Sequence, residues 1–172
     1  MQTVFRSRKF SVIRTDIPTS DGGTRSVDLI RHPGAVVVLP LLANGDIVLI
    51  RNFRYTLGRE LWELPAGTLD REGESTIAAA ARELEEETGY RAGALRAIGE
   101  IHPSPGVMDE VIHAFVATEL VQVAQQLEPT ERIVVASAPR DDALRMAYDG
   151  RMTDAKSVVT LVRWDWQSRN DQ

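Results

Sequence analysis

Apolar residues occur along the chain in short runs separated by turn residues, a pattern that predicts a sheet made of short strands. The first two predicted strands cover residues 10–14 and 26–31. Between them lies Asp21-Gly22-Gly23, and this turn sequence predicts that the two strands pair as an antiparallel hairpin. The chain is therefore expected to begin with an N-terminal antiparallel strand pair.

Two aliphatic runs follow at residues 35–42 and 47–51. The sequence Ala43-Asn44-Gly45-Asp46 joins them, and because its Asn-Gly pair favours a tight turn, we predict a second hairpin. Further strands are predicted at residues 97–101, 111–117 and 133–137.

A helical pattern appears at residues 75–88, and Gly89 after it predicts a left-handed C-terminal cap. The apolar positions expected on one face of this helix are Ile77, Ala80, Ala81 and Leu84. Two more helices are predicted at residues 141–148 and 155–166, separated by Asp149-Gly150. Strands interrupted by one helix and closed by two others predict an α/β fold of the α/β/α sandwich type.

Length and composition narrow the class of protein. A chain of 172 residues fits a single domain over residues 1–172, and 43% hydrophobic with 26% charged residues is typical of a globular protein rather than a disordered or fibrous one. The chain has no cysteine, which excludes disulfides, thiolate metal ligands and a cysteine nucleophile. Any metal must therefore be bound by oxygen or imidazole.

Charge and hydropathy also indicate which partners to expect. The net charge is -5 and the basic residues are scattered, which argues against a broad nucleic-acid surface. The apolar runs are much shorter than the roughly 20 residues of a membrane span, and no signal-peptide pattern is present. We therefore expect a cytoplasmic protein with no nucleic-acid or membrane partner.

The helix at residues 75–88 carries an unusual concentration of acid. At about 100° per residue, Glu83, Glu86 and Glu87 fall within one arc of roughly 100°, which we expect to lie away from the apolar face. A solvated charged face is the ordinary interpretation of such a helix. A carboxylate cluster is also the ligand set that suits a hard cation such as Mg²⁺.

The segment from Gly67 to Tyr90, GTLDREGESTIAAAARELEEETGY, resembles the Nudix box, whose pattern is Gly, five residues, Glu, seven residues and Arg-Glu-U-x-Glu-Glu-x-Gly-U. The matching positions of the second half are Arg82, Glu83, Leu84, Glu86, Glu87, Gly89 and Tyr90. Glu74 stands the required seven residues before Arg82. One departure is that six residues, not five, separate Gly67 from Glu74, an extra residue in a loop.

The resemblance implies a Nudix fold and a site for Mg²⁺ or Mn²⁺. It implies Glu83 and Glu87 as direct ligands and Glu86 as a further one, with the carbonyl of Ala66 completing the set. Gly67, Glu74 and Arg82 are expected to support the box.

Outside the box, the segments RNFRY at 51–55, ELWELPAG at 60–67 and SPGVMDE at 104–110 resemble the ADP-ribose pyrophosphatase branch of the family. In that branch a proline lies about as far beyond the box as Pro105 does here, which favours ADP-ribose over NADH or dinucleoside polyphosphates. Arg54 is the expected contact of the substrate diphosphate, since a guanidinium fork suits phosphate oxygens. Glu63 and Glu110 are weaker candidates for substrate binding, and either could equally be paired within the fold.

The resembling enzymes take a general base from a loop beyond the box, and the corresponding segment here is residues 127–132. Glu131 is the expected base, with Glu128 in reserve. The expected reaction is hydrolysis of ADP-ribose to AMP and ribose 5-phosphate. The branch also implies a homodimer in which residues 1–31 take part in dimerisation.

Three alternatives stay open at this stage. GDP-mannose or another nucleotide sugar presents the same diphosphate, and the box cannot distinguish them. A non-catalytic ADP-ribose sensor would usually have lost the box carboxylates, which are complete here. RNA end processing would need a basic path for the nucleic acid, which the scattered charges do not provide.

Overall fold

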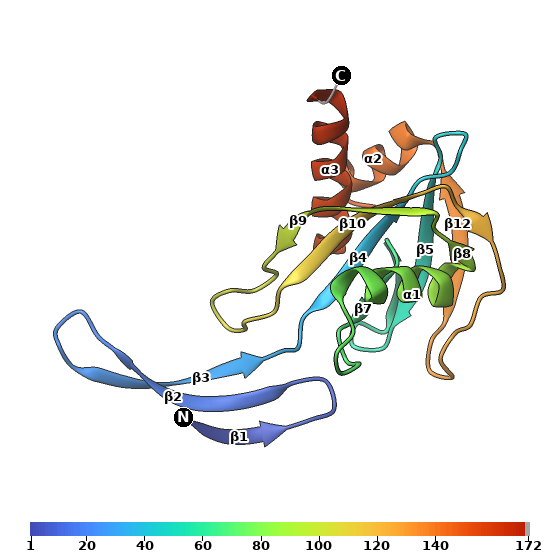
Figure 1. Cartoon of the computed structure of the whole chain (residues 1–172). Helices are drawn as coiled ribbons and strands as arrows, with labels where there is room; N and C mark the ends of the chain where they lie inside the picture. The colour runs from blue at the N-terminus through green and yellow to red at the C-terminus, as the bar shows by residue number, and fades with distance from the viewer. Residues whose placement is uncertain (171–172) are drawn as a thin grey trace.

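The structure is a computed structural model that describes residues 1–170, and its strands form four small sheets accompanied by three helices (Figure 1). The elements in chain order are β1 (Gln2–Arg6), β2 (Ser11–Pro18), β3 (Thr24–Arg31), β4 (Ala35–Pro40), β5 (Ile47–Arg54), β6 (Arg59–Glu63), β7 (Ala66–Thr68), α1 (Thr76–Thr88), β8 (Tyr90–Arg91), β9 (Ala94–Ile101), β10 (Ile112–Thr118), β11 (Val121–Gln122), β12 (Ile133–Ala138), α2 (Arg140–Tyr148) and α3 (Ala155–Asn170).

Strand β4 lies at the centre of the molecule and is buried along its whole length. Its side chains alternate between two cores, as the period of two in a strand requires. Val36 and Val38 pack in the core that includes Leu84 of α1, whereas Val37 and Leu39 pack in the core that includes Leu161 of α3. The α1 helix thus covers one face and α3 the other, which confirms the predicted α/β/α layering (Figure 1).

The second hairpin predicted from the sequence is wrong. The turn forms as expected, with Gly45 at a φ of 87°, but β4 and β5 belong to different sheets and share only one isolated bridge, Leu41 to Ile47. The sheet orders are β7-β4-β10-β9 and β12-β5-β6. The cause is that β4 is apolar on both faces, as in central strands, and both of its edges are occupied, by parallel β10 and antiparallel β7.

The N-terminal strand pair is present and is joined by a third strand. β2 and β3 pair antiparallel from Ser11–Arg31 to Pro18–Thr24, and β1 adds to the other edge of β2. Every residue of β1 is exposed, so no alternation of buried and exposed positions signalled it. Figure 1 shows this sheet extending away from the rest of the molecule.

Helix α1 begins after Ser75, whose hydroxyl accepts a hydrogen bond from the N–H of Ala78, and ends at Gly89 with a φ of 69°. Both boundaries were predicted, but the buried face was predicted only in part, since Ala80 and Leu84 are buried as expected. Ile77 and Ala81 are exposed, and the buried positions of the helix are Ala79, Ala80, Glu83, Leu84, Glu87 and Thr88. Two of the three clustered carboxylates therefore face inward, beside the apolar face and not away from it.

Helices α2 and α3 lie where the sequence predicted them, and α3 continues four residues further, to Asn170. Within residues 1–170, no helix combines the length and apolar character that crossing a membrane requires.

Candidate active site

Five glutamates from two parts of the chain line one cavity of about 640 Å³. Three of them, Glu83, Glu86 and Glu87, come from α1, and the other two, Glu128 and Glu131, come from the loop before β12. The cavity is also lined by Arg54 at the end of β5 and by residues of β7. The structure therefore brings together most of the site residues that the sequence singled out.

Strand β7 lies directly beneath the Glu83 carboxylate. A Cβ atom on Gly67 would lie 1.9 Å from Cδ of Glu83, so only a glycine leaves room for this carboxylate. Burial raises the pKa of Glu83, and the neighbouring charge of Arg82 opposes that rise. The first glycine of the box thus has a steric role in placing an acidic group.

Glu87 is the most deeply buried of the five glutamates, and its Oε2 accepts a hydrogen bond of 2.8 Å from the N–H of Ala66. Its pKa is raised from 4.5 to about 8, mainly by burial and also by the charges of Glu83 and Glu131, whereas the Ala66 N–H opposes the rise. A cation bound beside this carboxyl would lower its pKa and stabilise its charged form.

Arg82 lines the cavity and connects three glutamates. It donates to both oxygens of Glu74, at 2.9 Å each, and its Nη1 donates to Glu83 at 2.5 Å and Glu86 at 3.0 Å. Because of the paired hydrogen bonds with Glu74, the pKa of Arg82 is raised and that of Glu74 is lowered. The extra residue between Gly67 and Glu74 lies in the loop before α1, and Arg82 still makes both hydrogen bonds with Glu74.

Arg54 is half-buried, and its guanidinium is held from behind by Glu63, the last residue of β6. Nε of Arg54 donates to Oε1 of Glu63 at 2.7 Å, and Nη2 donates to Oε2. Glu63 has no exposed surface and also accepts a hydrogen bond of 2.8 Å from Nζ of Lys156. Glu63 therefore contacts Arg54 and not the cavity, which removes it as a direct substrate contact.

Glu110 is also paired within the fold. Its Oε1 lies 3.4 Å from Nδ1 of His32, and it does not line the carboxylate cavity. Of the three predicted substrate contacts, only Arg54 reaches that cavity. Pro105 lies between β9 and β10 and does not line it either.

Glu128 and Glu131 lie on the same loop, and both line the cavity. The Glu131 carboxylate accepts a hydrogen bond of 2.8 Å from the N–H of Glu128, and the Glu131 N–H donates to the Glu128 carbonyl at 2.9 Å. At the end of the loop, the guanidinium of Arg132 lies 5.6 Å from the ring centres of both Phe53 and Tyr55. These contacts attach the end of the acidic loop to β5 and the residue that follows it.

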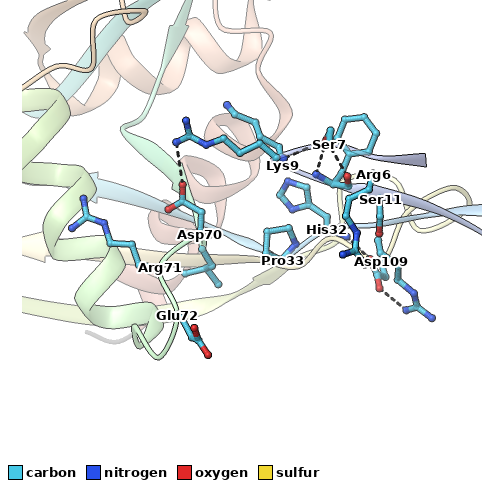
Figure 2. Close-up of a pocket in the computed structure, with 14 residues that line it drawn as sticks. Arg6, Ser7, Lys9, Ser11, His32, Pro33, Asp70, Arg71, Glu72 and Asp109 are labelled. Atoms are coloured by element: carbon cyan, nitrogen blue, oxygen red, sulfur yellow. Dashed lines mark hydrogen bonds and ion pairs between the residues drawn. The ribbon is translucent and has the colours of Figure 1, made fainter. Parts of the chain in front are cut away.

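The sequence did not indicate that the turn between β1 and β2 would contribute to the site. Arg8 and Lys9 line the carboxylate cavity and also an adjoining cavity of about 580 Å³. Figure 2 shows Ser7 and Lys9 on one side of this second cavity and the loop residues Asp70 to Glu72 on the other. The basic turn comes from the N-terminal sheet, and no local motif links it to the box.

The donor set fits a hard divalent cation. Glu83, Glu86 and Glu87 offer only oxygen, and burial together with the charges of Glu83 and Glu131 raises the pKa of Glu87, so a nearby cation would stabilise its charged form. Within residues 1–170, no three His, Asp or Glu side chains already surround a common point, because Arg82 holds Glu83 and Glu86 to its own side. Binding a cation would require these two carboxylates to rotate from Arg82 toward Glu87.

The sequence model of the NUDIX domain matches residues 31–160. The chain belongs to the Nudix family. The matched Nudix segment contains every residue of the carboxylate cavity named above except Arg8 and Lys9, which precede it.

Two curated relatives of this Nudix chain carry different substrates in their names. It is 34% identical over 162 residues to an ADP-ribose pyrophosphatase of Bacillus subtilis (strain 168), covering 93% of this chain and 87% of the relative. It is also 34% identical over 172 residues to a GDP-mannose pyrophosphatase of Yersinia pestis (strain Pestoides F), covering 91% of this chain and 83% of the relative. The chain is accordingly a Nudix hydrolase.

A solved structure of an ADP compounds hydrolase has the same fold. It superposes with a TM-score of 0.85 at 24% identity, covering 99% of this chain and 92% of the other. The Nudix fold expected from the sequence is therefore confirmed.

Proposed function

We propose that this Nudix hydrolase cleaves the diphosphate bond of a nucleoside-diphosphate sugar, with ADP-ribose as its main substrate and AMP and ribose 5-phosphate as its products. The observation that carries the proposal is the meeting of the α1 carboxylates, Glu131 and Arg54 around one cavity. The name of the Bacillus subtilis relative supports the choice of ADP-ribose.

The carboxylates of Glu83, Glu86 and Glu87, with the carbonyl of Ala66, would hold Mg²⁺ or Mn²⁺ in this cavity. When bound, such an ion neutralises phosphoryl charge and lowers the pKa of water. Glu74 supports the site by fixing the guanidinium of Arg82, and Glu83 and Glu86 would turn from that guanidinium to reach the ion.

Arg54 binds the diphosphate, because its guanidinium is fixed by Glu63 and still faces the cavity. Glu131 takes a proton from the attacking water, and Glu128 is its substitute. The water oxygen forms a bond to one phosphorus, the bridging P–O bond breaks, and its electron pair leaves with the other phosphate.

A panel of substrates tests the proposal. We expect ADP-ribose to give the highest kcat/KM with Mg²⁺ among ADP-ribose, GDP-mannose, NADH, diadenosine polyphosphates and deoxynucleoside triphosphates, with AMP identified by chromatography. A preference for GDP-mannose, which the Yersinia relative makes the second candidate, would overturn the substrate but not the reaction. Binding of ADP-ribose without cleavage would instead support the sensor.

We also propose that the enzyme acts as a homodimer through its N-terminal sheet. The support is the set of apolar side chains that this sheet exposes, namely Val4, Phe5, Phe10 and Ile17. Light scattering after size exclusion should give twice the chain mass of 19.1 kDa. A monomer at micromolar concentration would contradict this part of the proposal.

A further inference from the structure

A row of alternating charges runs from helix α3 to the cavity. Lys156, in the first turn of α3, donates to Oε2 of Glu63 at 2.8 Å, and Oε2 also accepts a hydrogen bond from Nη2 of Arg54. Glu63 has no exposed surface, and Lys156 is mostly buried. Two cations from elements distant in the sequence therefore share one buried oxygen.

We propose that Lys156 is a positioning residue of the hydrolytic site, which acts through Glu63 to hold the guanidinium of Arg54 toward the substrate diphosphate. The inference rests on the proposed function of Arg54. Lys156 does not line the cavity, so it has no contact with substrate of its own.

Lys156 is itself fixed by the start of α3. Its Nζ lies 2.9 Å from Oδ1 of Asp154, and Oδ2 of Asp154 accepts hydrogen bonds from the N–H and hydroxyl of Ser157. The Ser157 hydroxyl oxygen in turn accepts a hydrogen bond of 2.8 Å from the N–H of Leu64. Helix α3 is thus attached to the end of β6 at two successive residues, Glu63 and Leu64.

The shared oxygen determines how much of Arg54 is available to substrate. Glu63 uses Nε and Nη2 of Arg54, and within residues 1–170 Nη1 donates no hydrogen bond. Without Lys156, the buried carboxylate would have Arg54 as its remaining cationic partner, and their attraction would draw the guanidinium inward. The Arg54 guanidinium would then lie further from the diphosphate, and Glu63 would neutralise more of its charge.

Steady-state kinetics of Lys156→Met and Lys156→Arg test the proposal. We expect Lys156→Met to raise KM for the diphosphate substrate about tenfold with a smaller change in kcat, and Lys156→Arg to restore most of the KM. In an Arg54→Met background, Lys156→Met should leave KM unchanged, because the group it positions is gone. Arg151→Met, which removes an exposed pair with Asp149, is the control and should leave KM unchanged.

The proposal is overturned if Lys156→Met lowers the melting temperature but keeps the KM of the parent, or if its KM effect is the same with and without Arg54. If Lys156→Met does not fold, Lys156→Gln retains a donor for Glu63 and is read in the same way.

A second readout does not depend on turnover. The Nε–H resonance of Arg54 in ¹⁵N NMR, assigned with Arg54→Lys, should shift in Lys156→Met and return toward its original position in Lys156→Arg. An unchanged resonance overturns the proposal. A shifted resonance in a protein that cleaves none of the nucleotide sugars would support the positioning and refute the proposed reaction.

Discussion

The Glu83 carboxylate lies in the space that Gly67 leaves by having no side chain. Adding a single methyl group at position 67 therefore tests the site. In Gly67→Ala the new Cβ would overlap Cδ of Glu83, so the carboxylate must move. A displacement of about 1 Å can reduce catalysis about a hundredfold, and we expect a loss of kcat/KM of that order with the fold retained.

Gly106→Ala is the matched control for Gly67→Ala, since nothing lies within 4 Å of a Cβ at Gly106. Hydrolysis rates and circular dichroism of the two variants provide the measurement. Equal activity in both would mean that Glu83 does not need its place above β7.

Glu87 gives a prediction for stability against pH in the presence of a chelator. Its pKa is about 8 in the folded protein, well above the ordinary 4.5, so the folded state binds more protons between these values. The contribution of Glu87 to the free energy of unfolding is therefore fully present below about pH 4.5 and is lost as the pH rises through about 8. Since each pKa unit corresponds to about 1.4 kcal/mol, the loss should be a few kcal/mol.

Glu87→Gln removes this titration and should lose less stability than the parent between about pH 5 and pH 9. Calorimetric melting temperatures at several pH values provide the measurement, and Mg²⁺ should narrow the gap at high pH. Parallel curves of melting temperature against pH for the two proteins would show that burial does not raise the pKa of Glu87.

Local spacing accounts for the residues that the sequence could predict in the site. Glu86 and Glu87 stand three and four residues after Glu83 on one helix, so their proximity to Glu83 follows from helical geometry. Glu63 and Lys156 are separated by 93 positions, and their contact depends on how α3 packs against β6. No periodicity or motif carries that information.

At the level of elements, the end of α1 is joined to the loop that carries Glu131. The carbonyls of Glu86 and Gly89 accept hydrogen bonds from the N–H groups of Gln126 and Val123, at 2.9 and 2.7 Å. Gly89 has a positive φ, and a Cβ there would lie 2.9 Å from the carbonyl oxygen of Val123. The helix cap is therefore also an anchor for the acidic loop.

Gly89→Ala should for this reason cost more than backbone strain alone. Gly45→Ala, whose Cβ would meet nothing within 4 Å at a φ of 87°, should lose about 1–2 kcal/mol from its left-handed conformation. We expect Gly89→Ala to lose more stability in urea unfolding and also to lower kcat, because residues 123–126 must shift. If both variants lost the same stability and Gly89→Ala kept the kcat of the parent, the helix cap would not act as an anchor for the loop.

The elements also show where pattern reading fails. Strands β4 and β5 and the turn between them were predicted, but the turn sequence cannot tell a hairpin from a corner between two sheets. The short strands β6 and β7, which contribute Glu63 and Gly67 to the site, contain five and three residues and gave no usable alternation.

At the level of the whole molecule, the layering follows from β4 and β10. Their side chains pack alternately in the core beneath α1 and in the core beneath α3. A strand buried on both faces predicts helices on both faces, and this much was readable from the sequence. The position of the N-terminal sheet was not, because no residue of its three strands belongs to either core. Single-domain organisation and a cytoplasmic location stay predictions.

The most direct test of the central claim is the hydrolysis of ADP-ribose with Mg²⁺ by the parent protein, Glu87→Gln and Glu85→Gln. Glu85 lies on the same helix but pairs with Arg91 and does not line the cavity, so it is the matched control. The account expects AMP and ribose 5-phosphate from the parent and Glu85→Gln, and a loss of at least about a hundredfold in Glu87→Gln with its fold intact. Normal turnover by Glu87→Gln, and likewise by Glu83→Gln, would contradict it.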